Sequence, residues 1–440
     1  MLTTSAVSFL LFVASVLAQP EPPTKMSRQQ AIDLALAADS GNIQFRESRE
    51  QLQRERARRR QNRADLLPHL SAGVRQSSQT TNLEALGLRP QGLFRPPSLV
   101  GPFSTFDARV RMTQTLFSTS AIRNIRSSDR AIARQEEEGR HTQQRIASQV
   151  SRLYLSALRL KSQLEAAQAR LGLAQKLLAL VQRQRANGLG TAIEETRANL
   201  EVARARQNLQ NTRFESETAL QQLAHFLSLD LDRELDLTDR MDDVSPLEWT
   251  YPMAIQRAIE GRKDLRALEA AVLEAGSRLG AVRATRLPEL QGFAEYGTIG
   301  SAASNTIPTW AVGAQLEIPI FRGGRTGAQA AELRSQLRSR RLATDELRRK
   351  IELDTRVGLA RLHLTAGQLG VGEEARQLAE NEVARAERRY RAGVSTNLEV
   401  IEAQTHLTQA IDALVAARYQ HQLARISFGE TLGILLTELP

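Results

Sequence analysis

The residue types that most often carry out chemistry are sparse in this sequence and do not cluster. Cysteine is absent, so the chain offers neither a disulfide nor a thiolate metal ligand. Gly323, Gly324 and Gly327 lack the Gly-Lys-Ser/Thr ending of a phosphate-binding loop, and no nucleophile elbow is present. The histidines lack the spacing of metal ligands: His69, His141, His225, His363, His406 and His421. The sequence therefore predicts no enzyme activity, no cofactor and no bound metal.

The elements that would position any functional residue are two very long helices. Apolar residues recur at three-four spacing in the first of them, which is the pattern of a coiled-coil seam. These residues are Val150, Leu153, Ala157, Leu160, Leu164, Ala167, Leu171, Ala174, Leu178 and Val181. No proline lies between Pro102 and Pro246, so nothing breaks a helix from about Ser118 to Asn187. Such a helix would be on the order of 100 Å long, too long for a compact globule.

The same order of elements occurs twice along the chain. In each copy a helix stops at a Leu-Pro-x-Leu segment, at Leu67–Leu70 and at Leu287–Leu290, and two strands and two long helices follow. The turn 186–191 matches the turn 391–396 around a shared Gly and Thr. We interpret this as an internal duplication, with a first repeat over 27–243 and a second over 244–436.

The expected elements of the first repeat are a helix over 27–66 with Ser27 as its N-cap, two strands, and the two long helices 118–187 and 192–227. A Gly/Pro-rich loop over about 80–104 joins the strands, and the Asp-rich stretch 230–243 is interpreted as a linker. The second repeat is expected to have strands over 290–298 and 310–320, a helix over 325–390 and a last helix that carries Leu398 to Ala417. Pro319 is expected to mark the end of the fourth strand.

Each predicted strand alternates apolar and polar residues. Phe106, Ala108, Val110 and Met112 share one face of the second strand, and charged or polar residues occupy the other. A soluble sandwich would give the same alternation with its apolar face turned inward. Two features favour a membrane instead: the strands have the ~10-residue length that crosses a bilayer when tilted, and aromatic residues gather near their ends.

Four strands cannot close a barrel, and an open sheet edge in lipid leaves backbone groups unpaired. Chains must therefore share the wall: two copies would give the ~8-strand minimum, filled by side chains, and three or more would leave a water channel. The predicted fold is an α+β membrane protein, in which a long antiparallel coiled-coil α-helical barrel continues a transmembrane β-barrel shared between protomers, with four strands per chain.

The N-terminus and the charge of the chain suggest where the protein acts. Leu10 to Ala18 is a short apolar run ending in small residues, which predicts a signal peptide over 1–18 followed by a linker over 19–26. Without a cysteine after this run, a lipid anchor of the bacterial lipoprotein kind is excluded. The net charge of +10 would suit nucleic acid, but Arg alternates with Glu and Gln along helix faces, and we expect no nucleic-acid partner.

This duplicated order closely resembles the TolC family of bacterial outer membrane efflux proteins. The Leu-Pro-x-Leu helix ends, the segment 318–325 (IPIFRGGR) and the turn 390–400 (YRAGVSTNLEV) carry the resemblance. The resemblance covers nearly everything after the signal and implies a homotrimer with a twelve-stranded barrel in the outer membrane and a helical tunnel across the periplasm. It further implies an inner-membrane pump and a periplasmic adaptor as partners, contact with outer-membrane lipid, and a duct that performs no chemistry.

The resemblance also implies a gate. The family's periplasmic entrance is narrowed by acidic residues whose positions fall on Glu399 and Glu402, and a ring of such carboxylates would favour cations. The alternative is that these are solvated residues at a helix N-terminus, where Glu complements the dipole. Glu194 and Tyr390 match the family's acidic and tyrosine latch residues, but Ser395 stands at the Arg position, so the charged latch is incomplete.

The two turns resemble the tips that meet the adaptor. The implied contact residues are Gly188, Leu189 and Thr191 in the first turn, and Gly393, Val394 and Thr396 in the second. A glycine between two helices is also an ordinary C-cap, and both interpretations remain open at this point.

The main alternative function is a soluble or periplasmic coiled-coil scaffold without channel activity. It would explain the long helices and the basic charge. It does not explain why pairs of bilayer-length strands interrupt the helices twice at matching places. A second alternative, the adaptor itself, would require a compact β-rich domain split around one hairpin, which the sequence lacks.

Overall fold

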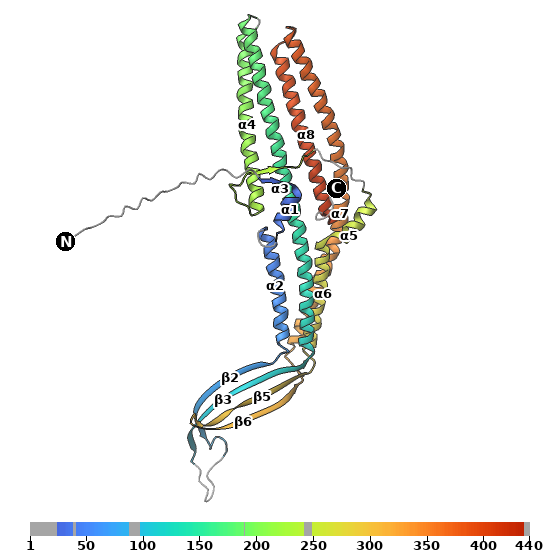
Figure 1. Ribbon diagram of the computed structural model, residues 1–440. Helices are drawn as coiled ribbons and strands as arrows, with labels where there is room; N and C mark the ends of the chain where they lie inside the picture. Colours follow the sequence, from blue (N-terminus) through green and yellow to red (C-terminus); the bar gives the residue numbers. More distant parts are fainter. Residues whose placement is uncertain (1–23, 38–40, 88–96, 189, 242–248, 435–440) are drawn as a thin grey trace, which may run out of the picture. The chain divides into compact units, whose positions relative to one another are not determined.

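Two helices of more than sixty residues dominate the chain in the computed structural model, α3 with 68 residues and α7 with 67 (Figure 1). The structure describes residues 24–37, 41–87, 97–188, 190–241 and 249–434. The predicted signal peptide lies outside these residues. The helices are α1 Arg28–Ala35, α2 Ile43–Ala64, α3 Thr119–Ala186, α4 Ala192–Phe226, α5 Tyr251–Gly261, α6 Lys263–Ala284, α7 Arg325–Arg391 and α8 Asn397–Leu432. The strands are β1 Thr24–Met26, β2 His69–Asn82, β3 Leu99–Ser118, β4 Leu235–Leu237, β5 Glu289–Ala302 and β6 Asn305–Glu317.

The chain forms two compact units, and each takes segments from both predicted repeats. One unit consists of residues 1–46, 143–254 and 355–440 and is called the hairpin unit here. The other consists of residues 47–142 and 255–354 and is called the strand unit. The predicted order of the four strands and the long helices is confirmed, since β2-β3-α3-α4 is followed later in the chain by β5-β6-α7-α8. The division into 27–243 and 244–436 stays a prediction.

The strand unit contains one four-stranded antiparallel sheet in the order β2-β3-β5-β6 (Figure 1). All four predicted strands are present and are longer than expected, with 13 to 20 residues each. The loop expected over 80–104 is therefore shorter than predicted, because β2 continues to Asn82 and β3 begins at Leu99. Pro319 follows the end of β6, as the sequence predicts. β2 and β6 are the outer strands, and each has one edge without a partner strand in the described chain.

The two faces of this sheet differ in chemistry because successive side chains of a strand alternate between faces. The register places Val110 between Ala72 and Tyr296, and Tyr296 opposite Trp310. The apolar face is exposed in the single chain, with Trp310 76% exposed. The opposite face carries polar and charged residues, such as Arg111, which lies between Ser71 and Glu295 in the register.

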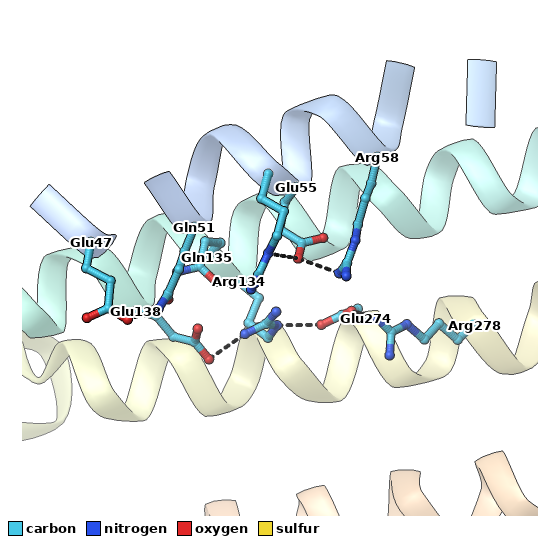
Figure 2. A network of polar contacts seen from close by, with 10 residues as sticks. Glu47, Gln51, Glu55, Arg58, Arg134, Gln135, Glu138, Glu274 and Arg278 are labelled. Atoms are coloured by element: carbon cyan, nitrogen blue, oxygen red, sulfur yellow. Dashed lines mark hydrogen bonds and ion pairs between the residues drawn. The ribbon is translucent and has the colours of Figure 1, made fainter. Parts of the chain in front are cut away.

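The helices of the strand unit are joined by a partly buried polar network (Figure 2). The Arg134 guanidinium on α3 lies 2.6 Å from a carboxylate oxygen of Glu274 on α6 and 2.5 Å from Glu138 on its own helix. Burial alone would lower the pKa of Arg134, but these carboxylates outweigh it and the pKa is raised. The Gln135 side chain, next to Arg134, donates to Gln51 on α2. One turn of α3 therefore connects both α2 and α6.

The hairpin unit packs α4, α8 and the C-terminal parts of α3 and α7. Its largest fully buried side chain is Tyr154, whose hydroxyl donates to the Met26 carbonyl at 3.0 Å. Met26 ends β1, which pairs in parallel with β4. Both strands correct the sequence analysis, because β1 lies in the predicted linker 19–26 and β4 in the predicted linker 230–243. Two three-residue strands carry no recognisable alternation, and they exist because they pair with each other.

The first predicted helix is also corrected. Ser27 is the N-cap, in a capping box with Gln30, as its position predicts. The single helix expected over 27–66 is instead two helices, α1 and α2. After α1, the backbone N–H of Asn42 donates to the Ala35 carbonyl, and the Asn42 side chain accepts from the Gln44 N–H to begin α2. No helix among the described residues combines the length and the apolar character needed to cross a membrane.

Candidate channel entrance

The turn between α3 and α4 is a compact cap built on Gly188. Its backbone has φ +76°, a conformation that favours glycine, and its N–H donates to the Arg185 carbonyl at 3.0 Å. Thr191 is the N-cap of α4, and its hydroxyl accepts from the Glu194 N–H. Leu189, the remaining predicted contact residue of this turn, lies outside the described residues.

The turn between α7 and α8 repeats this geometry around Gly393. Gly393 has φ +73°, and its N–H donates to the Tyr390 carbonyl while the Val394 N–H donates to the Arg389 carbonyl, both at 3.1 Å. This is the paired hydrogen-bond pattern that closes a helix with a left-handed glycine. Thr396 is the N-cap of α8 but makes no side-chain capping bond. Both glycines are therefore C-caps, whatever else the turns contact.

The matching glutamates of the two turns have different roles. The Glu194 carboxylate accepts from the Thr191 backbone N–H at 2.9 Å and completes the capping box of α4. Glu399 makes no such bond and instead pairs with Arg389 across the turn, with 3.0 Å between Nε and Oε1. The predicted gate residue Glu194 thus stabilises its own helix start, and Glu399 has its charge offset by a guanidinium.

Glu402, the second predicted carboxylate of the entrance, lies one turn further along α8. It is exposed, and no hydrogen bond or ion pair connects it to another described residue. Arg389 and Glu399 border a groove of about 370 Å³ between α7 and α8, which Arg385 and Glu382 also line. Of the two predicted entrance carboxylates, Glu402 is the one whose negative charge is not offset by a direct partner among the described residues.

Tyr390 lies in an apolar cluster that joins the two hairpins behind the turns. The cluster packs Val181 and Leu177 of α3 against Tyr390 of α7 and Val400 of α8. The ring is 4% exposed, and its hydroxyl has no hydrogen-bond partner among the described residues. Burial raises the pKa of the Tyr390 hydroxyl, and the negative charge of Glu194 raises it further. The predicted latch residues Tyr390 and Glu194 are thus close enough to interact electrostatically, but no hydrogen bond joins their side chains.

Asn397, which the sequence analysis missed, makes a polar contact between the hairpins directly behind the turns. Asn397 is fully buried, and its Nδ2 donates to the backbone carbonyl of Glu194 at 2.9 Å. Aligning the two turns on their shared Thr would have pointed to it, because Asn397 stands where the first turn has Ala192. Arg389 was missed too, since nothing in its local sequence distinguishes it from the neighbouring Arg388.

The surface of the turns is more apolar than a solvated helix end requires. Val394 is 66% exposed, Ile193 64% and Leu398 42%. Gly188, Thr191, Gly393 and Thr396, the other described residues of the predicted adaptor contact, are exposed as well. The structure thus places all described members of that set at the tips of the two hairpins of one unit.

Comparison with known proteins identifies the family. The family model described as outer membrane efflux protein matches residues 34–228 and 254–433. The chain is 25% identical to the probable efflux pump outer membrane protein SepC of Pseudomonas putida, over 91% of this chain and 82% of that protein. It is 26% identical to the alkaline protease secretion protein AprF of Pseudomonas aeruginosa, over 76% of this chain and 70% of that one.

Solved structures share the fold. The Campylobacter jejuni CmeC outer membrane channel superposes with a TM-score of 0.79 at 14% identity, covering 93% of this chain and 87% of that chain. The outer membrane protein VceC of Vibrio cholerae superposes with a TM-score of 0.74 at 18% identity, covering 92% and 96%. These structures show the same fold, and the family match covers most of the residues. The chain belongs to the outer membrane efflux protein family and acts in transport at the outer membrane.

Proposed function

We propose that three copies of this chain form one channel-tunnel, which passively conducts substrates from an inner-membrane pump and a periplasmic adaptor to the outside. The observation that carries the proposal is the sheet of the strand unit. It has an exposed apolar face and an unpaired edge on each of β2 and β6. Backbone groups along such edges are tolerated in lipid only when another strand pairs with them. Joining β6 of one copy to β2 of the next satisfies both edges.

Barrel geometry sets the lower limit on the number of copies, and three is the smallest number that leaves a lumen. Two chains would give eight strands, a barrel just wide enough for side chains to fill it. Three would give twelve and leave a lumen lined by the polar face of the sheet, with the apolar face turned to outer-membrane lipid. Transport as the role of that lumen is also supported by the related proteins, which are named as efflux and secretion proteins. The scaffold alternative leaves the apolar face of the sheet without a partner and is not favoured by any contact described above.

The proposal is tested by purifying the full chain in detergent, cross-linking it and recording single channels in planar bilayers. We expect a cross-linked trimer and steady ionic conductance. Successive N–H groups of a strand point to opposite edges, so one of the two neighbouring substitutions Gln76→Pro and Ser77→Pro removes a donor from the free edge of β2. That variant should abolish the trimer, because proline cannot donate to the ladder. The matched control is Gln79→Pro, at the β2 register shift, where the ladder is already irregular. A monomer without conductance from the unaltered chain would refute the proposal.

We further propose that the turns dock onto the adaptor and that the region behind them closes the tunnel. Their exposed apolar residues support docking, and the bond from Asn397 to Glu194 supports closure by direct contact between the hairpins. Because the chain has no cysteine, Val394→Cys gives a single reactive site. We expect it to cross-link to an adaptor with a thiol-reactive probe, and Leu231→Cys, exposed after α4, serves as the control. Equal cross-linking at both sites would refute docking at the turn.

A further inference from the structure

The polar face of the strand sheet carries a cluster of charges that the transport role does not explain. The Arg109 guanidinium lies 2.7 Å from Asp107 and 3.0 Å from Glu295, and Arg111 lies 2.5 Å from Glu295. Arg75 stands opposite Asp107 in the register, yet no ion pair joins it to a described residue. Three guanidiniums against two carboxylates leave one positive charge per chain at this level of the sheet.

Four of these side chains, Arg75, Asp107, Arg109 and Arg111, line a pocket of about 280 Å³ with a floor of small residues. Ser71 and Gly73 of β2 form part of its lining, together with Arg75, Arg109 and Arg111. A side chain built at Gly73 would meet no other atom within 4 Å, so the space above this glycine is open. The pocket is therefore a hollow in the surface of the sheet, framed by three guanidiniums and one carboxylate, that of Asp107.

Glycine on the other side of Arg109 keeps this frame in place. Gly297 is the register partner of Arg109 on β5. A Cβ atom at Gly297 would lie 2.4 Å from the Cβ atom of Arg109 and 2.4 Å from the Ala108 carbonyl oxygen, so no larger residue fits. The absence of a side chain lets Arg109 lie across β5 and reach Glu295, while N–H donors of the guanidinium remain for a ligand, since it has five.

Other acidic residues of this face lie too far away to cancel the charge. Glu289 and Glu317 pair with each other in the register at the end of the sheet nearest the helices. Glu289 is six residues from Glu295 along β5, roughly 20 Å at ~3.3 Å per residue. This exceeds the ~8 Å screening length of physiological salt, so their charge is largely screened at the pocket.

We propose that this pocket binds an oxyanion, the phosphate, sulfate or carboxylate group of a molecule in the lumen. Guanidiniums offer paired N–H donors in the fork geometry that matches such groups, and Arg75 provides the charge that is not already neutralised. The proposal rests on the proposed function, because it needs the polar face of the sheet to line a water-filled passage. A threefold channel would carry three such pockets at one level.

The test is current block in planar bilayers that contain the full channel, with tripolyphosphate added on the side of the β5–β6 hairpin. We expect millimolar block of the wild-type channel. Arg75→Gln should weaken it about fivefold or more, because a charge-assisted hydrogen bond is lost. Gly73→Val should weaken it as much without changing any charge, because it fills the open space above the floor. Gly73→Ser serves the same purpose should the valine variant fail to assemble.

The control for Gly73→Val is Ser77→Val, on the same face of β2 but outside the pocket, which should leave block unchanged. The site would be overturned if Arg75→Gln weakened the block while Gly73→Val and Gly73→Ser left it intact. In that case the anion would respond only to the general electric field of the pore. Comparing sulfate with octyl sulfate separates the two sources of the oxyanion: equal block assigns the pocket to free anions, and stronger block by octyl sulfate assigns it to the head group of a larger cargo. A channel that conducts normally but shows no block refutes this inference alone, whereas absent conductance refutes the proposed function.

Discussion

Replacing Arg389 by Gln should make the channel more selective for cations. In the structure Arg389 pairs with Glu399 at 3.0 Å, while Glu402 has no direct partner among the described residues. The three side chains therefore carry one negative charge per chain, and the substitution raises this to two. In a trimer the ring gains three negative charges. Both partners of the pair are largely exposed, at 59% and 42%, so the substitution acts on the field of the pore far more than on stability.

The size of the expected change in selectivity follows from Coulomb's law. A unit charge about 10 Å from an ion on the axis contributes ~0.4 kcal/mol in water, and three contribute ~1.2 kcal/mol. Screening over a Debye length of ~10 Å at 0.1 M salt reduces this to about 0.45 kcal/mol. That free energy favours potassium by about twofold and disfavours chloride by the same factor, so the permeability ratio should rise about fourfold.

Reversal potentials in a potassium chloride gradient measure this ratio. Glu399→Gln and Glu402→Gln should each lower it by a similar factor, and Arg389→Gln combined with Glu399→Gln should restore the wild-type ratio. The matched control is Arg213→Gln, which breaks another exposed Arg–Glu pair on α4. Arg213 lies about 32 Å along the helix from its start, at ~1.5 Å per residue. The reasoning would be refuted if Arg389→Gln left the permeability ratio unchanged while Glu402→Gln lowered it as expected. Arg389 would then not offset the charge of Glu399.

Three further predictions concern stability. Tyr390→Phe should raise the free energy of unfolding by about 1 kcal/mol, because it removes a buried hydroxyl without a partner; a loss in thermal unfolding experiments would instead reveal a hydrogen-bonded latch. Glu274→Leu should lower the free energy of unfolding by about 3 kcal/mol, because it leaves the half-buried Arg134 without its partner on α6. The control Glu217→Leu removes an exposed carboxylate and should lower it by under about 1 kcal/mol. Equal losses in the two variants would contradict the network. Burial opposes the charge of Asp264, but hydrogen bonds from Arg262 outweigh burial and lower the pKa of Asp264 below its ordinary value of 3.8. The charged carboxylate therefore contributes fully to folding stability above pH 3.8. This stability is lost as the pH falls through the lower pKa of the folded state. The difference in melting temperature between the wild type and Asp264→Asn should therefore be largest near neutral pH and vanish in acid, and a constant difference would contradict this.

The sequence predicted the long helices and the strands because their periodicity is local and extends over many residues. The seam from Val150 to Val181 needs only its own spacing to be recognised, and α3 ends within a residue of the predicted end. The turns were predictable for the same reason, since Gly188 and Gly393 occur at matching places in two copies. The alternation of the strands fixed their faces, which the register of the sheet confirms.

The parts that could not be predicted depend on distant partners. β1 and β4 have three residues each and are paired across more than two hundred positions, so no local pattern reveals them. The break between α1 and α2 is stabilised in part by the Asn42 side chain, which donates to the Phe226 carbonyl, 184 residues away. The different roles of Glu194 and Glu399 depend on Arg389, which nothing in the local sequence separates from its neighbour.

The interleaving of the two compact units has a consequence for how the chain must mature. Each unit takes segments from both halves of the sequence, so the first half alone completes neither of them. Ordering one stretch before its distant partner arrives costs conformational entropy that only the later contacts recover. Stable structure should therefore form only after the whole chain has been delivered. A secreted chain that stays open until its last helix emerges is one that a translocation machine can thread from end to end, and it depends on protection from proteases in the meantime.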